Sequence, residues 1–273
     1  AKKTTAPSSF YKVAMQATPK YAFLIDAIIA IKCFGVATSY LVVVGDLVPM
    51  AMLHMFPGSS GLHSRTLWVL VGFCIVAPLS CLRSLDALRW TSGLSGVFLA
   101  FLLSLVVGYA LPGLTGLDPC ATSLQVAANA ELSDCHGDRA YVLVSAAALH
   151  VMPIFVFGFA CQQNSFAIVN ELRNPTIARI DSVFVASIGT AVIVYIIMAS
   201  AGYIAFGDTV KSNILVSYPN NGITSTARIF VSFVVAFHYP LQSHPARRSV
   251  LTLLQHISLS QQKSAMPPSF TTS

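Results

Sequence analysis

Two short runs place side chains that can bind or titrate within otherwise apolar sequence. Residues 161–164 read Cys-Gln-Gln-Asn and follow about twenty mostly apolar residues, which include Pro153 and Gly158. His238 lies deep in a later apolar run, two residues before Pro240. Amides and a thiol can hold polar groups, a proline frees a backbone carbonyl by removing an N–H, and histidine changes charge near neutral pH. These residue types could bind a small polar solute and relay a proton.

Each of these features also has a purely structural interpretation. Pro153 can kink a helix whose polar end reaches the membrane surface, and His238 can be packed among neighbouring helices. Lys32 lies two turns into the first apolar run, where an ionisable side chain costs about 2.5–3.5 kcal/mol. We therefore expect Lys32 to pair with Asp26 or to extend toward the inner surface, rather than to take part in transport.

The composition indicates an integral membrane protein. The 273 residues are 55% hydrophobic and only 10% charged, whereas a soluble domain carries about 25% charged residues. The apolar runs are long and continuous and lack an alternation of period two, so we predict an all-α fold. The net charge of +6 is expected to follow the positive-inside rule and does not indicate nucleic-acid binding.

Turn-forming residues divide the chain into six predicted transmembrane spans. These are residues 24–47, 66–82, 92–111, 140–163, 182–206 and 226–243. We expect a cytosolic N-terminal segment (1–20), a transmembrane domain (21–250) and a polar C-terminal tail (251–273), disordered from about residue 256. The first residues form no signal peptide and include no initiating Met, so we expect a processed product or a piece of a larger protein.

The distribution of basic residues predicts that both termini are cytosolic. In this orientation the inner segments hold eleven: Lys2, Lys3, Lys12, Lys20, Arg83, Arg89, Arg173, Arg179, Arg247, Arg248 and Lys263. The outer loops hold four: Arg65, Arg139, Lys211 and Arg228. Eleven against four favours this orientation by the lysine and arginine bias.

The same orientation places the loop 112–139 on the non-cytosolic side. This loop contains Cys120 and Cys135. Because that compartment is oxidising, we expect a disulfide between them, with two free thiols as the alternative. Closing a loop of about 15 residues would stabilise the protein by about 3 kcal/mol.

Five runs, in order, resemble the amino acid/auxin permease family, which includes the system A/N neutral amino acid transporters. They are IKCFGVATSYLVVVGDLVP at 31–49, APLSCLRSLDALRWTS at 77–92, VFGFACQQNSFAIVNEL at 156–172, YIAFGDTVKSNIL at 203–215 and YPLQSHPARRS at 239–249. The sequence also resembles the amino acid permeases of kinetoplastid protozoa. The resemblance covers residues from about 10 to 250 and matches spans three to eight of the family's eleven.

The resemblance implies part of a leucine-transporter-like fold, with an inverted repeat of five plus five helices and one discontinuous helix. It implies substrate contacts from the broken span and from the third span of the family. These residues are Phe155, Phe157, Gly158, Phe159, Cys161, Gln162, Asn164, Gly35, Ser39 and Tyr40. Sodium-coupled relatives carry a hydroxyl residue at the position of His238. Since an imidazole is a poor ligand for a hard cation, we expect proton coupling at His238 or loss of the sodium site.

The sequence therefore predicts a secondary active amino acid transporter with alternating access around a midplane site. The alternative is a truncated, non-transporting membrane protein that acts only by association, or an inactive fragment. We expect no enzyme activity, cofactor or metal, because the chain has no HExxH, GxSxG or GxxxxGK[ST] motif. The expected partners are an amino acid, a proton or sodium ion and the lipid bilayer of the plasma membrane or a vacuole-like organelle. A cationic substrate would need a carboxylate in the cavity, and the central spans offer none beyond Asp26 and Asp46. This slightly favours neutral substrates.

Overall fold

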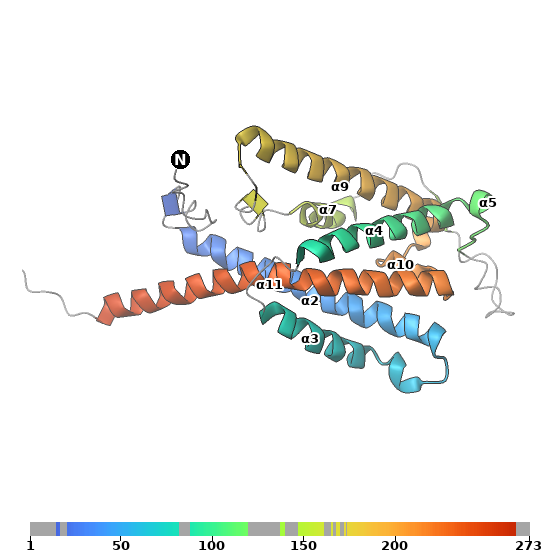
Figure 1. Cartoon of the computed structure of the whole chain (residues 1–273), viewed down its shortest axis with the longest axis horizontal. Coiled ribbons are helices and arrows are strands. Elements are labelled where there is room, and N and C mark those ends of the chain that lie inside the picture. The colour runs from blue at the N-terminus through green and yellow to red at the C-terminus, as the bar shows by residue number, and fades with distance from the viewer. Residues whose placement is uncertain are drawn as a thin grey trace, which may run out of the picture. The chain divides into compact units, whose positions relative to one another are not determined.

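The computed structural model describes residues 15–16, 21–81, 88–119, 137–139, 147–160, 165, 168–169, 172 and 174–265. Within these residues every regular element is helical, as the sequence predicts. The elements are α2 (Ala22–Met55), η2 (Ser60–His63), α3 (Arg65–Cys81), α4 (Leu88–Ala110), α5 (Pro112–Thr115), α7 (Ala147–Gly158), α9 (Ile177–Phe206), η3 (Gly207–Thr209), α10 (Ile214–Ser217) and α11 (Gly222–Ala265), shown in Figure 1.

Each of the six predicted spans overlaps one of the helices α2, α3, α4, α7, α9 and α11. In the described residues, three helices are long and apolar enough to cross a bilayer: Ala22–Met55, Gly93–Ala110 and Ile177–Thr209. Arg65–Ser80 and Leu149–Gly158 are shorter apolar helices. The chain is thus an all-helical membrane protein, and the count of six spans stays a prediction.

The last helix is longer than the sequence predicts. α11 runs for 44 residues, from Gly222 to Ala265, with Pro240 and Pro245 inside it. The disorder predicted from residue 256 is therefore wrong for residues 256–265. This segment contains the good helix formers Leu259, Gln261, Gln262, Lys263 and Ala265, so its polar composition does not stop the helix there.

The chain forms two compact units. One consists of Ala1–Ser39, Ala160–Thr176 and Tyr239–Ser273, and the other consists of Tyr40–Phe159 and Ile177–His238. The larger unit has its core where α4 packs against α9 (Figure 1). The buried residues of this core are Leu47, Leu105, Val106, Tyr109, Ala110, Ala201, Ala205, Phe206, Leu215, Tyr218 and Ala227.

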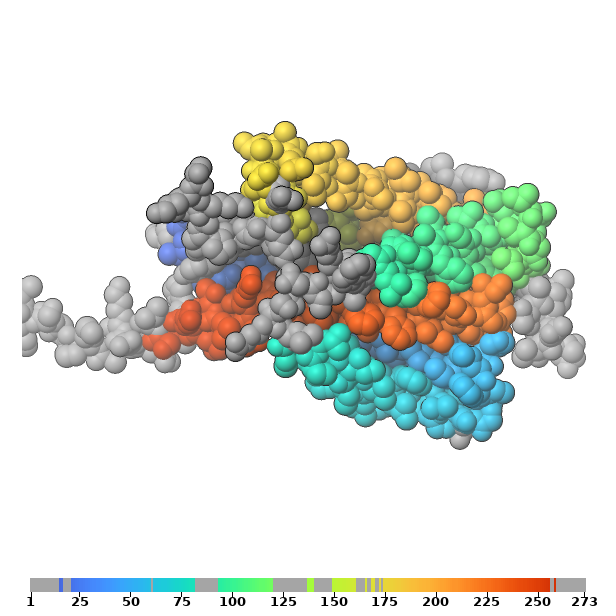
Figure 2. Space-filling model, in the orientation of Figure 1, coloured from blue at the N-terminus to red at the C-terminus, as the bar shows by residue number. Residues whose placement is uncertain are grey.

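The outward face of α9 is apolar along most of its length. Val185 is 72% exposed, and Ile193 and Ile196 are each 61% exposed. In the space-filling view, α9 lies at the surface of its unit (Figure 2). Such a face suits contact with lipid acyl chains, because apolar side chains that face lipid are not exposed to water.

Candidate functional site

The helix in the fourth predicted span stops within its apolar segment. α7 ends at Gly158, although the apolar run continues toward residue 163. The amide of Phe159 still donates to the carbonyl of Phe155, at 3.3 Å. Pro153 lies inside the helix, five residues before the end. The glycine, which has low helix propensity, thus marks the end more closely than the proline does.

A side chain of α9 donates a hydrogen bond to the carbonyl at this helix end. The hydroxyl of Tyr195 donates to the carbonyl oxygen of Gly158 at 3.2 Å. The ring of Tyr195 meets Phe159 edge-on, with 5.2 Å between ring centroids. A Cβ atom at position 158 would lie 3.6 Å from the same ring. The carbonyl that the missing helical turn leaves free is therefore satisfied by a tyrosine.

In the smaller unit, Lys32 binds the backbone just beyond the same break. Its Nζ atom donates to the carbonyl oxygen of Ala160 at 2.6 Å. The sequence predicts instead that Lys32 pairs with Asp26 or reaches the inner surface. A cation placed on a free carbonyl after a helix end is favourable, because the last carbonyls of a helix carry partial negative charge.

Most of the other predicted substrate residues that the structure describes are exposed. On α7, Phe155 is 62% exposed and Phe157 is 54% exposed. On α2, Gly35 and Ser39 are exposed and Tyr40 is half-buried, and the Ser39 hydroxyl donates to the carbonyl of Val36 at 2.7 Å. The structure brings Gly158 and Phe159 together with Tyr195. Cys161, Gln162, Asn164, Cys120 and Cys135 lie outside the described residues.

His238 is half-buried in α11, where its Nδ1 atom lies 2.7 Å from the carbonyl oxygen of Val234. A carbonyl only accepts, so Nδ1 carries the hydrogen. Nε2 is then the ring nitrogen that carries no hydrogen in the neutral ring. The bond fixes the orientation of the ring two residues before Pro240.

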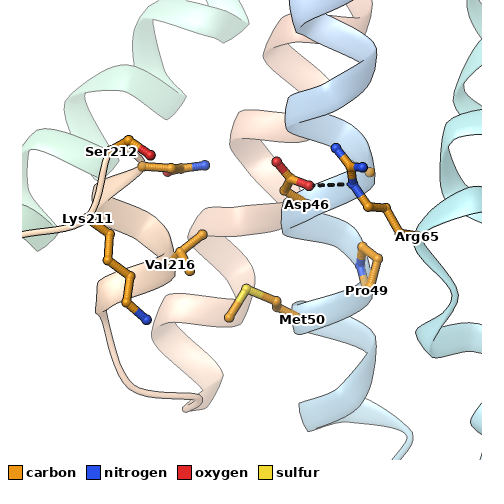
Figure 3. Close-up of a pocket in the computed structure, with 9 residues that line it drawn as sticks. Asp46, Pro49, Met50, Arg65, Lys211, Ser212 and Val216 are labelled. Atoms are coloured by element: carbon orange, nitrogen blue, oxygen red, sulfur yellow. Dashed lines mark hydrogen bonds and ion pairs between the residues drawn. The ribbon is translucent and has the colours of Figure 1, made fainter.

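A cleft lies in the larger unit beside the C-terminal half of α2. Its volume is about 620 Å³. In Figure 3 the guanidinium of Arg65 points at Asp46, and the Nε atom donates to Oδ1 at 2.7 Å. The Arg65 side chain is largely exposed and that of Asp46 is partly exposed, so this ion pair contributes little stability. The lining residues are Gly45, Asp46, Pro49, Met50, Arg65, Lys211, Ser212, Asn213 and Val216.

The cleft was not predicted, since its residues come from distant parts of the chain. Asp46 appears from sequence as an ordinary residue near the interface, and Arg65 and Lys211 appear as loop cations. The structure instead makes Arg65 the first residue of α3 and pairs it with Asp46. An acidic residue ending an apolar run, followed by a basic residue at the start of the next, is the only available signal.

Arg228 also has a different place from the predicted outer loop. It lies in α11 and is fully buried. Its Nε and Nη2 atoms donate to the carbonyl of Leu215 at 3.1 and 3.0 Å, and Nη2 also donates to that of Tyr218 at 2.9 Å. Nη1 donates to the side-chain oxygen of Asn220 at 2.5 Å. Arg228 thus fixes the connection between α10 and α11.

Comparison with known proteins shows the family that the chain matches. The family described as transmembrane amino acid transporter protein matches residues 3–273. Vacuolar amino acid transporter 5 of Schizosaccharomyces pombe is 35% identical over 246 residues, which are 89% of this chain and 54% of that protein. Vacuolar amino acid transporter 6 of Saccharomyces cerevisiae is 34% identical over 92% of this chain and 54% of its own length. Human solute carrier family 38 member 10 is 26% identical over 81% of this chain and 18% of its own.

The chain belongs to the transmembrane amino acid transporter family. This agrees with the resemblance seen in the sequence, and it agrees with the prediction that the chain is not an enzyme. The chain spans about half the length of the vacuolar transporters that it resembles. No solved structure matches it significantly.

Proposed function

We propose that this chain forms part of a secondary active transporter of amino acids. The observation that carries the proposal is the interrupted helix at Gly158, in a chain of this family. Helices interrupted at membrane depth supply free backbone groups, and secondary transporters use such groups to bind substrates. The carbonyl of Gly158, which now accepts from Tyr195, is one such group.

The substrate contacts that we propose come from the broken span and from α2. The substrate's ammonium group would take carbonyl oxygens near Gly158, and its carboxylate would take freed amides after the break. Cys161, Gln162 and Asn164 would add side-chain contacts. Gly35, Ser39 and Tyr40 would add contacts from α2, and Phe155, Phe157 and Phe159 would add apolar contacts.

The substrate class that we propose is neutral amino acids. A cationic side chain would need a carboxylate in the cavity, and α2 offers only Asp26 and Asp46. Asp46 is paired with Arg65 in the outer cleft. Neither carboxylate belongs to the predicted substrate wall.

We further propose proton coupling at His238 in a vacuole-like membrane. The names of the two fungal relatives place them in the vacuole. An acidic lumen would supply the proton gradient, and Nε2 of His238 would carry the charge. The fold would be part of a five-plus-five inverted repeat, with six spans, cytosolic termini and alternating access. The permease domain would extend over residues 21–250.

Uptake by the purified chain in liposomes tests the proposal. Labelled alanine, glutamine, leucine, lysine and glutamate would be compared at two pH values, each with and without sodium. We expect uptake of the neutral amino acids that rises with an imposed proton gradient and ignores sodium. His238→Ser should abolish the pH dependence. Uptake by this variant that needs sodium and ignores pH would count against coupling at His238.

A second candidate function is association without transport. In that case the chain alone would give no uptake. It would instead change uptake when reconstituted together with a complete relative.

A further inference from the structure

The smaller unit contains a buried acid that the proposed transport mechanism does not use. Asp26 lies one turn into α2 and is 4% exposed. Its Oδ1 atom accepts a hydrogen bond from the hydroxyl of Ser249, on α11, at 3.4 Å. Its Oδ2 atom is buried and has no hydrogen-bond partner among the residues that the structure describes.

The surroundings of Asp26 offer it no cation in the described part of the smaller unit. On α2 the nearest basic residue is Lys32, whose Nζ atom is bound to the carbonyl of Ala160. On α11 the ionisable neighbours of Ser249 are His244, Arg247 and Arg248, and both arginines are exposed. Among the described residues, the hydrogen bond made to the carboxyl group comes from a neutral hydroxyl.

An ionised carboxylate in such a place is strongly disfavoured. Removing a full charge from water without a counter-ion is costly, and the cost of burying a neutral acid is far smaller. Ser249 gives some support to the ionised form, because its hydroxyl donates to Oδ1. The site therefore suits a group that is neutral at rest and can become ionised transiently.

We propose that Asp26 is a proton-binding site, with the proton on Oδ2 and Ser249 as the donor that stabilises the carboxylate after the proton leaves. The step balances simply: the O–H bond at Oδ2 breaks, the electron pair stays on the carboxylate and the proton passes to water. This inference extends the proposed proton coupling and adds a second titrating group to His238. It also stands as a statement about protonation even if the chain transports nothing.

Infrared difference spectroscopy of the full chain in lipid nanodiscs tests the protonation directly. Ionised and protonated carboxyl groups absorb at different frequencies, and exposed acids are ionised above a pH of about 5. We expect a protonated-acid band that persists near neutral pH in the wild-type chain. Asp26→Asn should remove this band, and Asp181→Asn, at an exposed acid of α9, should keep it.

A second variant keeps the acid and alters only its partner. Ser249→Ala removes the donor to the carboxylate, so the band should persist to higher pH than in the wild type. An absent wild-type band, or a band that survives in Asp26→Asn, would overturn the proposal. A band that disappears when sodium is added at constant pH would also overturn it, because the carboxylate would then bind that cation.

Transport measurements separate this inference from the proposed function. In liposomes, Asp26→Asn should lose the acceleration of uptake by a proton gradient and retain exchange of labelled for unlabelled amino acid. If the wild-type chain gives no uptake, the proposed function fails, and the infrared result still decides whether Asp26 binds a proton. Gradient-driven uptake that is unchanged in Asp26→Asn would contradict a coupling role.

Discussion

Single polar atoms decide how tightly the start of α11 is held. The hydroxyl of Tyr109 lies 2.6 Å from the amide nitrogen of Asn221 and 3.2 Å from the hydroxyl of Thr224. The ring of Tyr109 stacks on that of Tyr218, at 4.6 Å between centroids. The hydroxyl of Tyr218 is buried without a hydrogen-bond partner among the described residues. Burial, with Tyr109 adding to it, raises the pKa of Tyr218, so this group stays neutral.

The two stacked tyrosines should respond in opposite ways to the same substitution. Tyr109→Phe removes the partner of the Asn221 side-chain nitrogen and of the Thr224 hydroxyl, and we expect a loss of about 1–2 kcal/mol in the free energy of unfolding. Tyr218→Phe removes an unsatisfied hydroxyl, and we expect a change between zero and a gain of about 1 kcal/mol. Thermal unfolding of both variants in one detergent measures this. A larger loss for Tyr218→Phe would contradict the assignment.

His244 makes stability depend on pH. Burial, and then the nearby Arg248 and Arg247, lower the pKa of His244 from its usual 6.5. Between the lowered value and 6.5, the unfolded chain binds a proton that the folded chain does not. The free energy of unfolding should therefore rise with pH through this window, and the contribution is complete above 6.5.

Unfolding midpoints measured across this pH range test the effect. His244→Gln should reduce the rise of the midpoint with pH, because the titrating group is gone. Arg248→Gln should reduce it in part, since one of the two neighbouring positive charges is removed. A rise as large in His244→Gln as in the wild type would show that other groups cause it.

At the scale of elements, the end of α9 depends on a close approach between two glycines. The amide of Gly137 donates to the carbonyl of Phe206 at 3.0 Å, and that of Asp208 donates to the carbonyl of Asp138 at 3.2 Å. Gly207, at the start of η3, has a φ of +62°. A Cβ there would collide with the carbonyl of Gly137 and lie 2.8 Å from that of Asp138.

Gly207→Ala should therefore destabilise the larger unit by about 2 kcal/mol or more, since it adds both backbone strain and a backbone clash. Gly189→Ala is the matched control, because Gly189 lies inside α9 with open space around it. We expect that control to be stabilising by about 0.5–1 kcal/mol. Thermal unfolding and the rate of protease cleavage near residue 138 are the measurements. Equal effects of the two variants would exclude a specific contact.

At the scale of the whole molecule, the number of spans sets the sides on which the termini lie. Six spans place both termini on the same side of the membrane. Three spans, the number of helices that meet the length and hydropathy requirement by themselves, would place them on opposite sides. The shorter helices α3 and α7 and the polar helix α11 decide between these topologies.

Single cysteines in a cysteine-free background should distinguish the two counts. Gln16→Cys and Ser258→Cys, both at exposed positions, should react with an impermeant thiol reagent from the same side of sealed vesicles. Lys211→Cys should react from the opposite side. Labelling of positions 16 and 258 from opposite sides would contradict six spans.

The predictable part of this fold follows from continuous apolar sequence. The runs at 24–47 and 182–206 lie within α2 and α9, and the polar residues after Gly158 mark the end of α7. Local pattern cannot predict partners that lie far apart in the chain. Ser249 is 223 residues from Asp26, and the residue bound by Lys32 is 128 away. The predicted substrate contacts and the disulfide stay predictions.

At the proposed substrate site, the hydrogen bond between Tyr195 and the carbonyl of Gly158 would affect how the substrate binds and leaves. An incoming ammonium group would have to displace the phenol, so loading would exchange one donor for another. Such an exchange yields only the difference between two hydrogen bonds, which keeps the net affinity moderate. A transporter must release its substrate on the far side of the membrane, so a moderate affinity would favour release. The hydroxyl of Tyr195 would then bind the carbonyl of Gly158 again.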